Sequence, residues 1–180
     1  MVEVSIVAIK GGLIGQPRSW LVRPPRPITS MVRRFHKITD DQVVDAPTVA
    51  DIEAELRQAL SDKVFVAHNA GVDLGVLGRA LPGFQPARVV DTLKIARRLL
   101  PGRDSYQLGA LVDAYGLARG LPADLAPHRA TYDALVCARL LSHLATSLGR
   151  GPLRLADLLD ATVGTAATNS VADEPAATLF

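Results

Sequence analysis

The sequence has a single cysteine and no apolar run near the ~20 residues that a membrane-spanning helix needs. Cys137 has no partner for an internal disulfide, so we expect a reducing compartment, the cytoplasm. No basic and then apolar leader opens the chain, and we therefore do not expect secretion. No pair of cysteines or histidines has the spacing of a zinc site, which argues against zinc.

Apolar residues make up 48% of the 180 residues, which is enough for the core of one domain. The net charge of +2 is uneven, because residues 1–150 hold 19 basic and 14 acidic residues and the rest is acidic. Arg33, Arg34 and Lys37 form a short basic cluster beside Phe35 and His36. This cluster suits a polyanionic partner, but a plain solvated surface explains it equally well.

The order of apolar patterns and turn signals indicates an α/β fold with a mixed sheet. We expect strands at 2–9, 19–23, 64–67 and 87–92, and helices at 49–60, 71–81, 93–100, 105–115 and 131–148. Thr48 is the expected N-cap of the first helix, and residues 24–47 hold too many prolines for one regular element. We expect one domain over 1–148, followed at 149–180 by a short helix near 155–161 and a disordered tail.

Polar side chains stand where two of the expected strands end. His68, Asn69 and Asp73 follow the strand at 64–67, and Asp91 ends the next one. The carboxyl ends of strands are the favoured place for ligands in α/β sheets. Taken singly, structural roles explain these residues best, because Asn69 or Asp91 can cap a helix.

A second polar group lies around the start of the last long helix. His128 precedes this helix and is expected in a loop that lets it lean over Asp133. Asp133 alone could simply be a favourable acid near a helix N-terminus. Together with Asp73, this group suits Mg²⁺ or Mn²⁺ with an adjacent general base. Two such ions about 4 Å apart can activate water and stabilise the leaving oxygen of a phosphodiester.

Four segments in order resemble the DEDDh 3′–5′ exonuclease family, which includes the proofreading epsilon subunit of bacterial DNA polymerase III. They are HNAGVDLGVL, VVDTLKIARRLLPG, SYQLGALVDAYGL and PHRATYDALVCARLL, and the resemblance runs over about residues 2–144. It implies a ribonuclease H-like fold and hydrolysis of nucleotides from the 3′ ends of single-stranded DNA or RNA. A DNA polymerase or another replication or repair protein is the implied partner.

The resemblance also implies roles for single residues. Asp73 and Asp133 match metal ligands of the family, with Mg²⁺ or Mn²⁺ as the cofactor. His128 matches the general base that takes a proton from the attacking water. His36 and Asn69 match positions that lie along the terminal nucleotide.

The sequence departs from the family in lacking its first motif, an Asp-x-Glu on the opening strand. In the family this strand is central in the sheet, between the strands that match 2–9 and 64–67. Glu3 matches an acid that is common on the second strand, and we do not count it as a metal ligand. We therefore expect a sheet without its central strand and a weak or inactive chain. A start codon assigned too late or a truncated chain would explain this departure.

Two other functions remain open on the sequence alone. A non-catalytic module could hold a 3′ end with His36, Asn69 and the basic cluster at 33–37 without cutting it. An interaction scaffold could dock to a polymerase, and the acidic segment after Gly151 is the feature that favours it.

Overall fold

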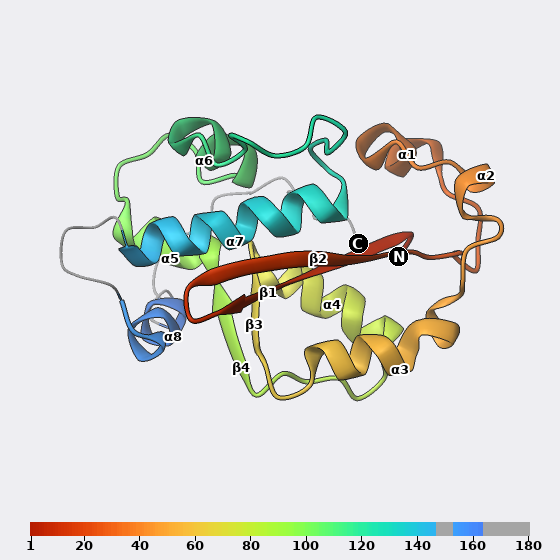
Figure 1. Cartoon of the computed structure of the whole chain (residues 1–180), viewed down its shortest axis with the longest axis horizontal. Helices are drawn as coiled ribbons and strands as arrows, with labels where there is room; N and C mark the ends of the chain where they lie inside the picture. Colours follow the sequence, from red (N-terminus) through yellow and green to blue (C-terminus); the bar gives the residue numbers. More distant parts are fainter. Residues whose placement is uncertain (147–152, 164–180) are drawn as a thin grey trace.

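The structure, a computed structural model, describes residues 1–146 and 153–163. In chain order, its elements (Figure 1) are β1 Glu3–Lys10, β2 Leu13–Leu21, α1 Ser30–His36, α2 Asp40–Val43, α3 Val49–Leu60, β3 Val64–Ala67, α4 Ala70–Ala80, β4 Arg88–Asp91, α5 Thr92–Leu99, α6 Leu108–Tyr115, α7 Ala130–Thr146 and α8 Leu155–Val163. The tail that we expected to be disordered falls at 164–180, outside the described residues.

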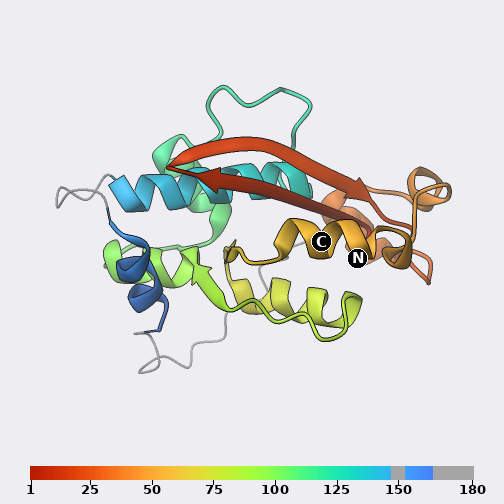
Figure 2. The ribbon, with the colours of Figure 1, turned by 60° about the horizontal axis from the view of Figure 1, so that its bottom comes forward.

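The strands form two separate two-stranded sheets (Figure 2). β1 and β2 pair as an antiparallel hairpin, and β3 and β4 pair in parallel. The α/β class is confirmed, and both pairing directions of a mixed sheet are present. Across 1–146 and 153–163, no strand pairs with both β1 and β3, so the central place expected between them holds no strand.

Local sequence signals account for α3. The Thr48 hydroxyl accepts a hydrogen bond from the Asp51 amide at 3.4 Å, and the Asp51 carboxylate accepts one from the Thr48 amide at 2.8 Å. This capping box satisfies free amides at the start of the helix, and the predicted N-cap at Thr48 is confirmed. Ile52 and Leu56 from its apolar stripe are buried.

The largest apolar cluster lies between α5, α6, α7, α8 and β4. Its fully buried members include Ile95, Leu111, Leu140 and Leu144. α7 runs along the β1–β2 hairpin (Figure 1, Figure 2), which places the start of this helix against the strands. The short helix expected near 155–161 forms as α8, and its Leu158 joins the cluster. Within the described ranges, no helix is long and apolar enough to cross a membrane.

The largest differences from the sequence prediction lie in three parts of the chain. β2 begins at Leu13 and continues through Pro17, which lies beside the irregularity in β1 between Val7 and Ile9, where a strand tolerates proline. The proline-rich connection contains the short helices α1 and α2. α6 begins at Leu108, three residues later than predicted, and the Ser105 hydroxyl accepts a hydrogen bond from the Gln107 amide just before it.

Candidate active site at the ends of β3 and β4

The parallel register brings two chain segments to one edge of the small sheet. Ala67 at the end of β3 pairs with Asp91 at the end of β4. α4 and α5 both start at this edge, at Ala70 and Thr92. The polar residues that follow the two strands are therefore brought together, as predicted.

Both carboxylate oxygens of Asp91 are used in hydrogen bonds to the backbone. One of its carboxylate oxygens accepts hydrogen bonds from the backbone amides of Asn69, Leu93 and Lys94, at 3.1, 3.0 and 3.4 Å. The other accepts from the amide of Ala70 at 3.1 Å. This carboxylate caps α5 and ties the start of α4 to the end of β4, so the structural interpretation of Asp91 holds.

His68 is also structural. Its Nδ1 lies 3.0 Å from the Thr92 hydroxyl, and its Nε2 lies 2.9 Å from the carbonyl oxygen of Tyr106. Because a carbonyl can only accept, Nε2 carries a proton and donates. Burial lowers the pKa of His68, which keeps the ring neutral. Both ring nitrogens are used, and His68 is not available to a substrate.

Asp73 is the opposite case. It lies in the first turn of α4, has 0% of its surface exposed, and neither carboxylate oxygen has a hydrogen-bond partner in the described part of the chain. Burial, together with the charges of Asp91 and Asp133, raises the pKa of Asp73 to about 8. A buried carboxylate without partners is costly to the fold, and this cost is a mark of functional sites.

Asp133 and His128 meet at the start of α7. His128 lies in the loop with φ 66°, and its backbone amide donates to the Asp133 carboxylate at 3.4 Å. Burial raises the pKa of Asp133 to about 6, while the His128 amide opposes this rise. The His128 ring stands edge-on to Phe35 of α1, with 6.1 Å between the ring centroids. The loop position predicted for His128 is what the structure shows.

Cys137 shows that the carboxylates share one neighbourhood. It lies on α7 four residues after Asp133 and is buried. Burial raises the pKa of Cys137 to about 12, and the charges of Asp73, Asp91 and Asp133 act in the same direction. Sequence reasoning did not place Cys137 in the site, although a spacing of four on one helix puts two side chains on the same face.

His36 and Asn69 both keep unused polar groups. His36 is 1% exposed, its Nδ1 accepts from the Ile38 amide at 2.9 Å, and its buried Nε2 has no partner among the described residues. Asn69 stands in the left-handed region with φ 65°, and its side chain makes no capping bond to α4. The alternative interpretation of Asn69 as a helix-capping side chain is therefore wrong, because the Asp91 carboxylate takes the amides at that end.

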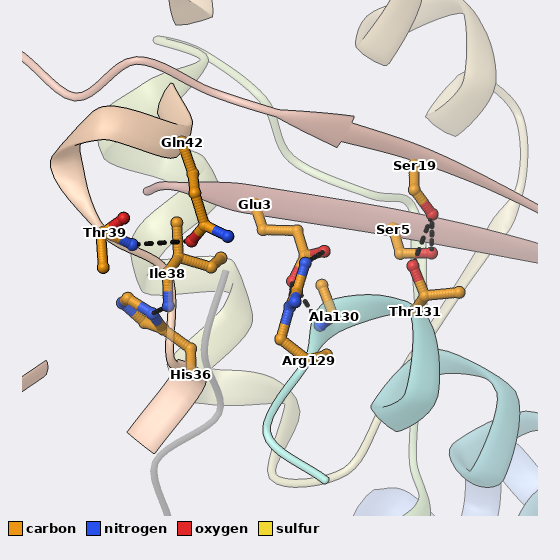
Figure 3. Close-up of polar contacts among 10 residues, drawn as sticks. All are labelled: Glu3, Ser5, Ser19, His36, Ile38, Thr39, Gln42, Arg129, Ala130 and Thr131. Carbon is orange, nitrogen blue, oxygen red and sulfur yellow. Dashed lines mark hydrogen bonds and ion pairs between the residues drawn. The ribbon is translucent and has the colours of Figure 1, made fainter. Parts of the chain in front are cut away.

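Glu3 is joined to the start of α7 (Figure 3). Its carboxylate accepts from the Arg129 guanidinium and from the backbone amide of Ala130. Beside it, the hydroxyls of Ser5, Ser19 and Thr131 form a chain with spacings of 2.9 and 2.7 Å (Figure 3). The sequence does not indicate these contacts, because β1 and α7 are more than a hundred residues apart.

The described residues suit a hard cation at Asp73. Across 1–146 and 153–163, no three His, Cys, Asp or Glu side chains converge as a complete metal site. Mg²⁺ is often held by only one or two carboxylates, with water and substrate phosphate as its other ligands. The two unpartnered oxygens of Asp73, whose pKa is raised in part by the charge of Asp133, fit this type of site.

Comparisons with known proteins agree with this geometry. Residues 1–141 match the family described as Exonuclease. The chain is 35% identical over 158 residues to exodeoxyribonuclease 10 of Escherichia coli strain K12, covering 88% of this chain and 68% of that protein. It is 30% identical over 169 residues to the PolC-type DNA polymerase III of Bacillus subtilis strain 168, covering 91% of this chain and 11% of that protein.

A solved structure agrees as well. Exonuclease X in complex with 5′ overhanging duplex DNA matches 90% of each chain, with a TM-score of 0.75 and 34% identity. The ribonuclease H-like fold implied by the sequence is thus confirmed. This chain belongs to the exonuclease family and is homologous to the 3′–5′ DNA exonucleases of the DEDDh type.

Proposed function

We propose that this exonuclease domain removes nucleotides from the 3′ ends of DNA with Mg²⁺ or Mn²⁺ held by Asp73 and Asp133. The observation that supports it is the buried Asp73 carboxylate, which has no hydrogen-bond partner among the described residues. The charge of Asp133 is one of the causes that raise its pKa. Exonucleases with this fold generally depend on two metal ions. Asp73 and Asp133 match two of the four acidic ligands of the family, so we expect slow hydrolysis.

The proton on Asp73 is part of this proposal. With a pKa of about 8, the carboxyl is mostly protonated at neutral pH when no cation is near. A cation favours the charged form, so its binding displaces this proton. A bound divalent cation polarises the phosphodiester and neutralises the charge that develops during hydrolysis.

His128 is the proposed general base. Its backbone amide donates to the Asp133 carboxylate, so this residue lies next to one of the two proposed cation ligands. We propose that it takes the proton of the attacking water, a step that typically contributes about 10²–10⁴-fold to a rate. Asn69 and His36, with free polar groups, are proposed to lie along the terminal nucleotide.

DNA is the proposed substrate, because the names of the relatives refer to deoxyribonucleases and DNA polymerases. The basic residues Arg33, Arg34 and Lys37 on and beside α1 can neutralise backbone phosphates near His128. The match to a segment of a PolC-type polymerase supports a polymerase as partner, and the bacterial DNA-processing relatives support a cytoplasmic location.

A nuclease assay tests the proposal. Single-stranded DNA carrying a 5′ label is incubated with the chain and Mn²⁺, and shortening from the 3′ end is followed on a gel. We expect a ladder of shortened products that chelation abolishes and that Asp133→Ala reduces at least about 100-fold. Asp113→Ala, on the exposed side of α6, is the matched control and should keep the wild-type rate.

A different result would favour the non-catalytic module. DNA binding that survives Asp133→Ala, weakens steeply with salt and gives no product under any divalent cation would contradict hydrolysis.

A further inference from the structure

One carboxylate on the first strand is bonded to the two residues that follow His128 (Figure 3). One oxygen of Glu3 accepts from the Arg129 Nε at 3.0 Å and from the Ala130 amide at 2.9 Å. Its other oxygen accepts from the Arg129 Nη2 at 2.9 Å. Both oxygens are therefore used, and the pairing with Arg129 is bidentate.

This geometry leaves little freedom to the backbone after His128. A bidentate pair between a carboxylate and a guanidinium fixes direction as well as distance. The Ala130 amide lies at the start of α7, where amides have no acceptor within the helix, and it donates to the Glu3 carboxylate instead. Glu3 is 6% exposed, so water competes weakly for these bonds.

The residue before this contact has an unusual backbone. His128 has φ 66°, a left-handed conformation that is unfavourable for a residue with a Cβ. It is held on one side by the bond from its amide to Asp133 and on the other by the bonds of Arg129 and Ala130 to Glu3. A backbone in this region persists when its surroundings determine it, and Glu3 supplies the contacts on the C-terminal side of His128.

We propose that Glu3 is a positioning residue that fixes the His128 loop for exonuclease action. The inference rests on the proposed function for its kinetic consequence, while the placement of the loop is independent of activity. Glu3 acts through Arg129 and Ala130 and does not contact the reacting atoms. A purely structural ion pair is the competing explanation, and it predicts a change in stability alone.

Magnetic resonance tests the placement without any activity. The chain has four histidines, and His128→Gln identifies the His128 ring signal. We expect Glu3→Gln to shift or broaden this signal and to weaken the contact between the Phe35 and His128 rings. The matched control is Glu53→Gln, which breaks the ion pair of Glu53 and Arg57 at 2.8 Å on α3 and should leave His128 unchanged. An unchanged His128 ring in folded Glu3→Gln would overturn the proposal.

Kinetics test the consequence. With 3′ shortening as the assay, Glu3→Gln should lower kcat about 10-fold to 100-fold and change KM far less, because a misplacement near 1 Å can cost about 100-fold. A fall in thermal stability with unchanged kcat would contradict the proposal. If Glu3→Gln does not fold, Arg129→Lys keeps the charge and loses the fork, and it should move the His128 signal in the same direction. If the wild type cuts no DNA, the proposed function fails while the resonance test of Glu3 still gives an answer.

Discussion

Two buried carboxylates at the same end of the β3–β4 pair differ in their hydrogen bonding. Asp91 accepts hydrogen bonds from four backbone amides at the starts of two helices. They belong to Asn69 and Ala70 at the start of α4 and to Leu93 and Lys94 in the first turn of α5. Asp73 has no hydrogen-bond partner in the described residues, although it is fully buried. Burial, with the charges of Asp91 and Asp133, raises the pKa of Asp73 to about 8.

The contrast separates what builds the fold from what serves the site. A buried carboxylate that accepts several amide bonds stabilises the elements that donate them. A buried carboxylate without partners destabilises the chain until a cation or a proton joins it. Asp91 therefore belongs to the architecture, and Asp73 belongs to the proposed metal site. The following changes test each side of this comparison.

The largest expected effect is on stability at Asp91. Asp91→Ala leaves the amides of Asn69, Ala70 and Leu93 without acceptors in a buried place. Lost caps and unsatisfied buried amides cost roughly 1–3 kcal/mol each, so we expect the free energy of unfolding to fall by about 3 kcal/mol or more. Urea unfolding followed by circular dichroism measures it. A loss below about 1 kcal/mol would mean that Asp91 does not tie α4 to β4.

At Asp73 we expect the opposite effect, a rise in the free energy of unfolding when the carboxyl group is replaced. The pKa of Asp73 is about 8 in the fold and 3.8 as the ordinary value, so folding favours the protonated form. This contribution is complete below about pH 4 and is lost as the pH rises through about 8. In chelator, Asp73→Asn should therefore be more stable than the wild type at about pH 9, by at least about 1 kcal/mol, since one pKa unit corresponds to about 1.4 kcal/mol.

Thermal unfolding between about pH 5 and about pH 9 measures this difference. Asp133, whose pKa is raised to about 6, remains in both proteins and adds a loss of the same sign at lower pH. An Asp73→Asn curve parallel to that of the wild type would contradict the raised pKa of Asp73.

The smallest expected effect on stability is at Asn69. Asn69→Gly keeps the backbone amide that donates to Asp91, and glycine suits φ 65°. We expect the free energy of unfolding to change by less than about 1 kcal/mol. The KM for DNA should rise about threefold to tenfold, because one hydrogen bond worth about 1 kcal/mol is lost. Unfolding and steady-state kinetics check both values, and an unchanged KM would remove Asn69 from the proposed nucleotide contact.

Much of the fold follows from local patterns. The capping box at Thr48 and Asp51 predicts α3, and a short apolar run before His68 predicts β3. The helices α1 and α2 were missed, because prolines around them conceal two short helical turns. The meeting of His68, Asn69 and Asp91 at one sheet edge was predicted from the topology, and a shared metal site of Asp73 and Asp133 stays a prediction from the family resemblance.

Other features of the site depend on contacts that the sequence does not display. The capping role of Asp91 was among the interpretations of the sequence, but nothing local indicates that Asp73 is left without a hydrogen-bond partner among the described residues. The bonds from Glu3 to Arg129 and Ala130 join positions 126 and 127 residues apart. The burial of His36 is likewise not visible in the sequence, because the proline-rich connection at 24–47 has no regular apolar pattern.

Calorimetric titration with Mn²⁺ tests the central claim most directly, with wild type and Asp73→Asn compared at neutral pH in two buffers of different ionisation enthalpy. We predict that the wild type binds the cation with release of a proton, because the pKa of Asp73 is about 8. Asp73→Asn should bind at least about tenfold more weakly and release no proton at this site, while Asp113→Asn should match the wild type. Equal Mn²⁺ affinity and equal proton release in wild type and Asp73→Asn would contradict the assignment of Asp73 to the metal.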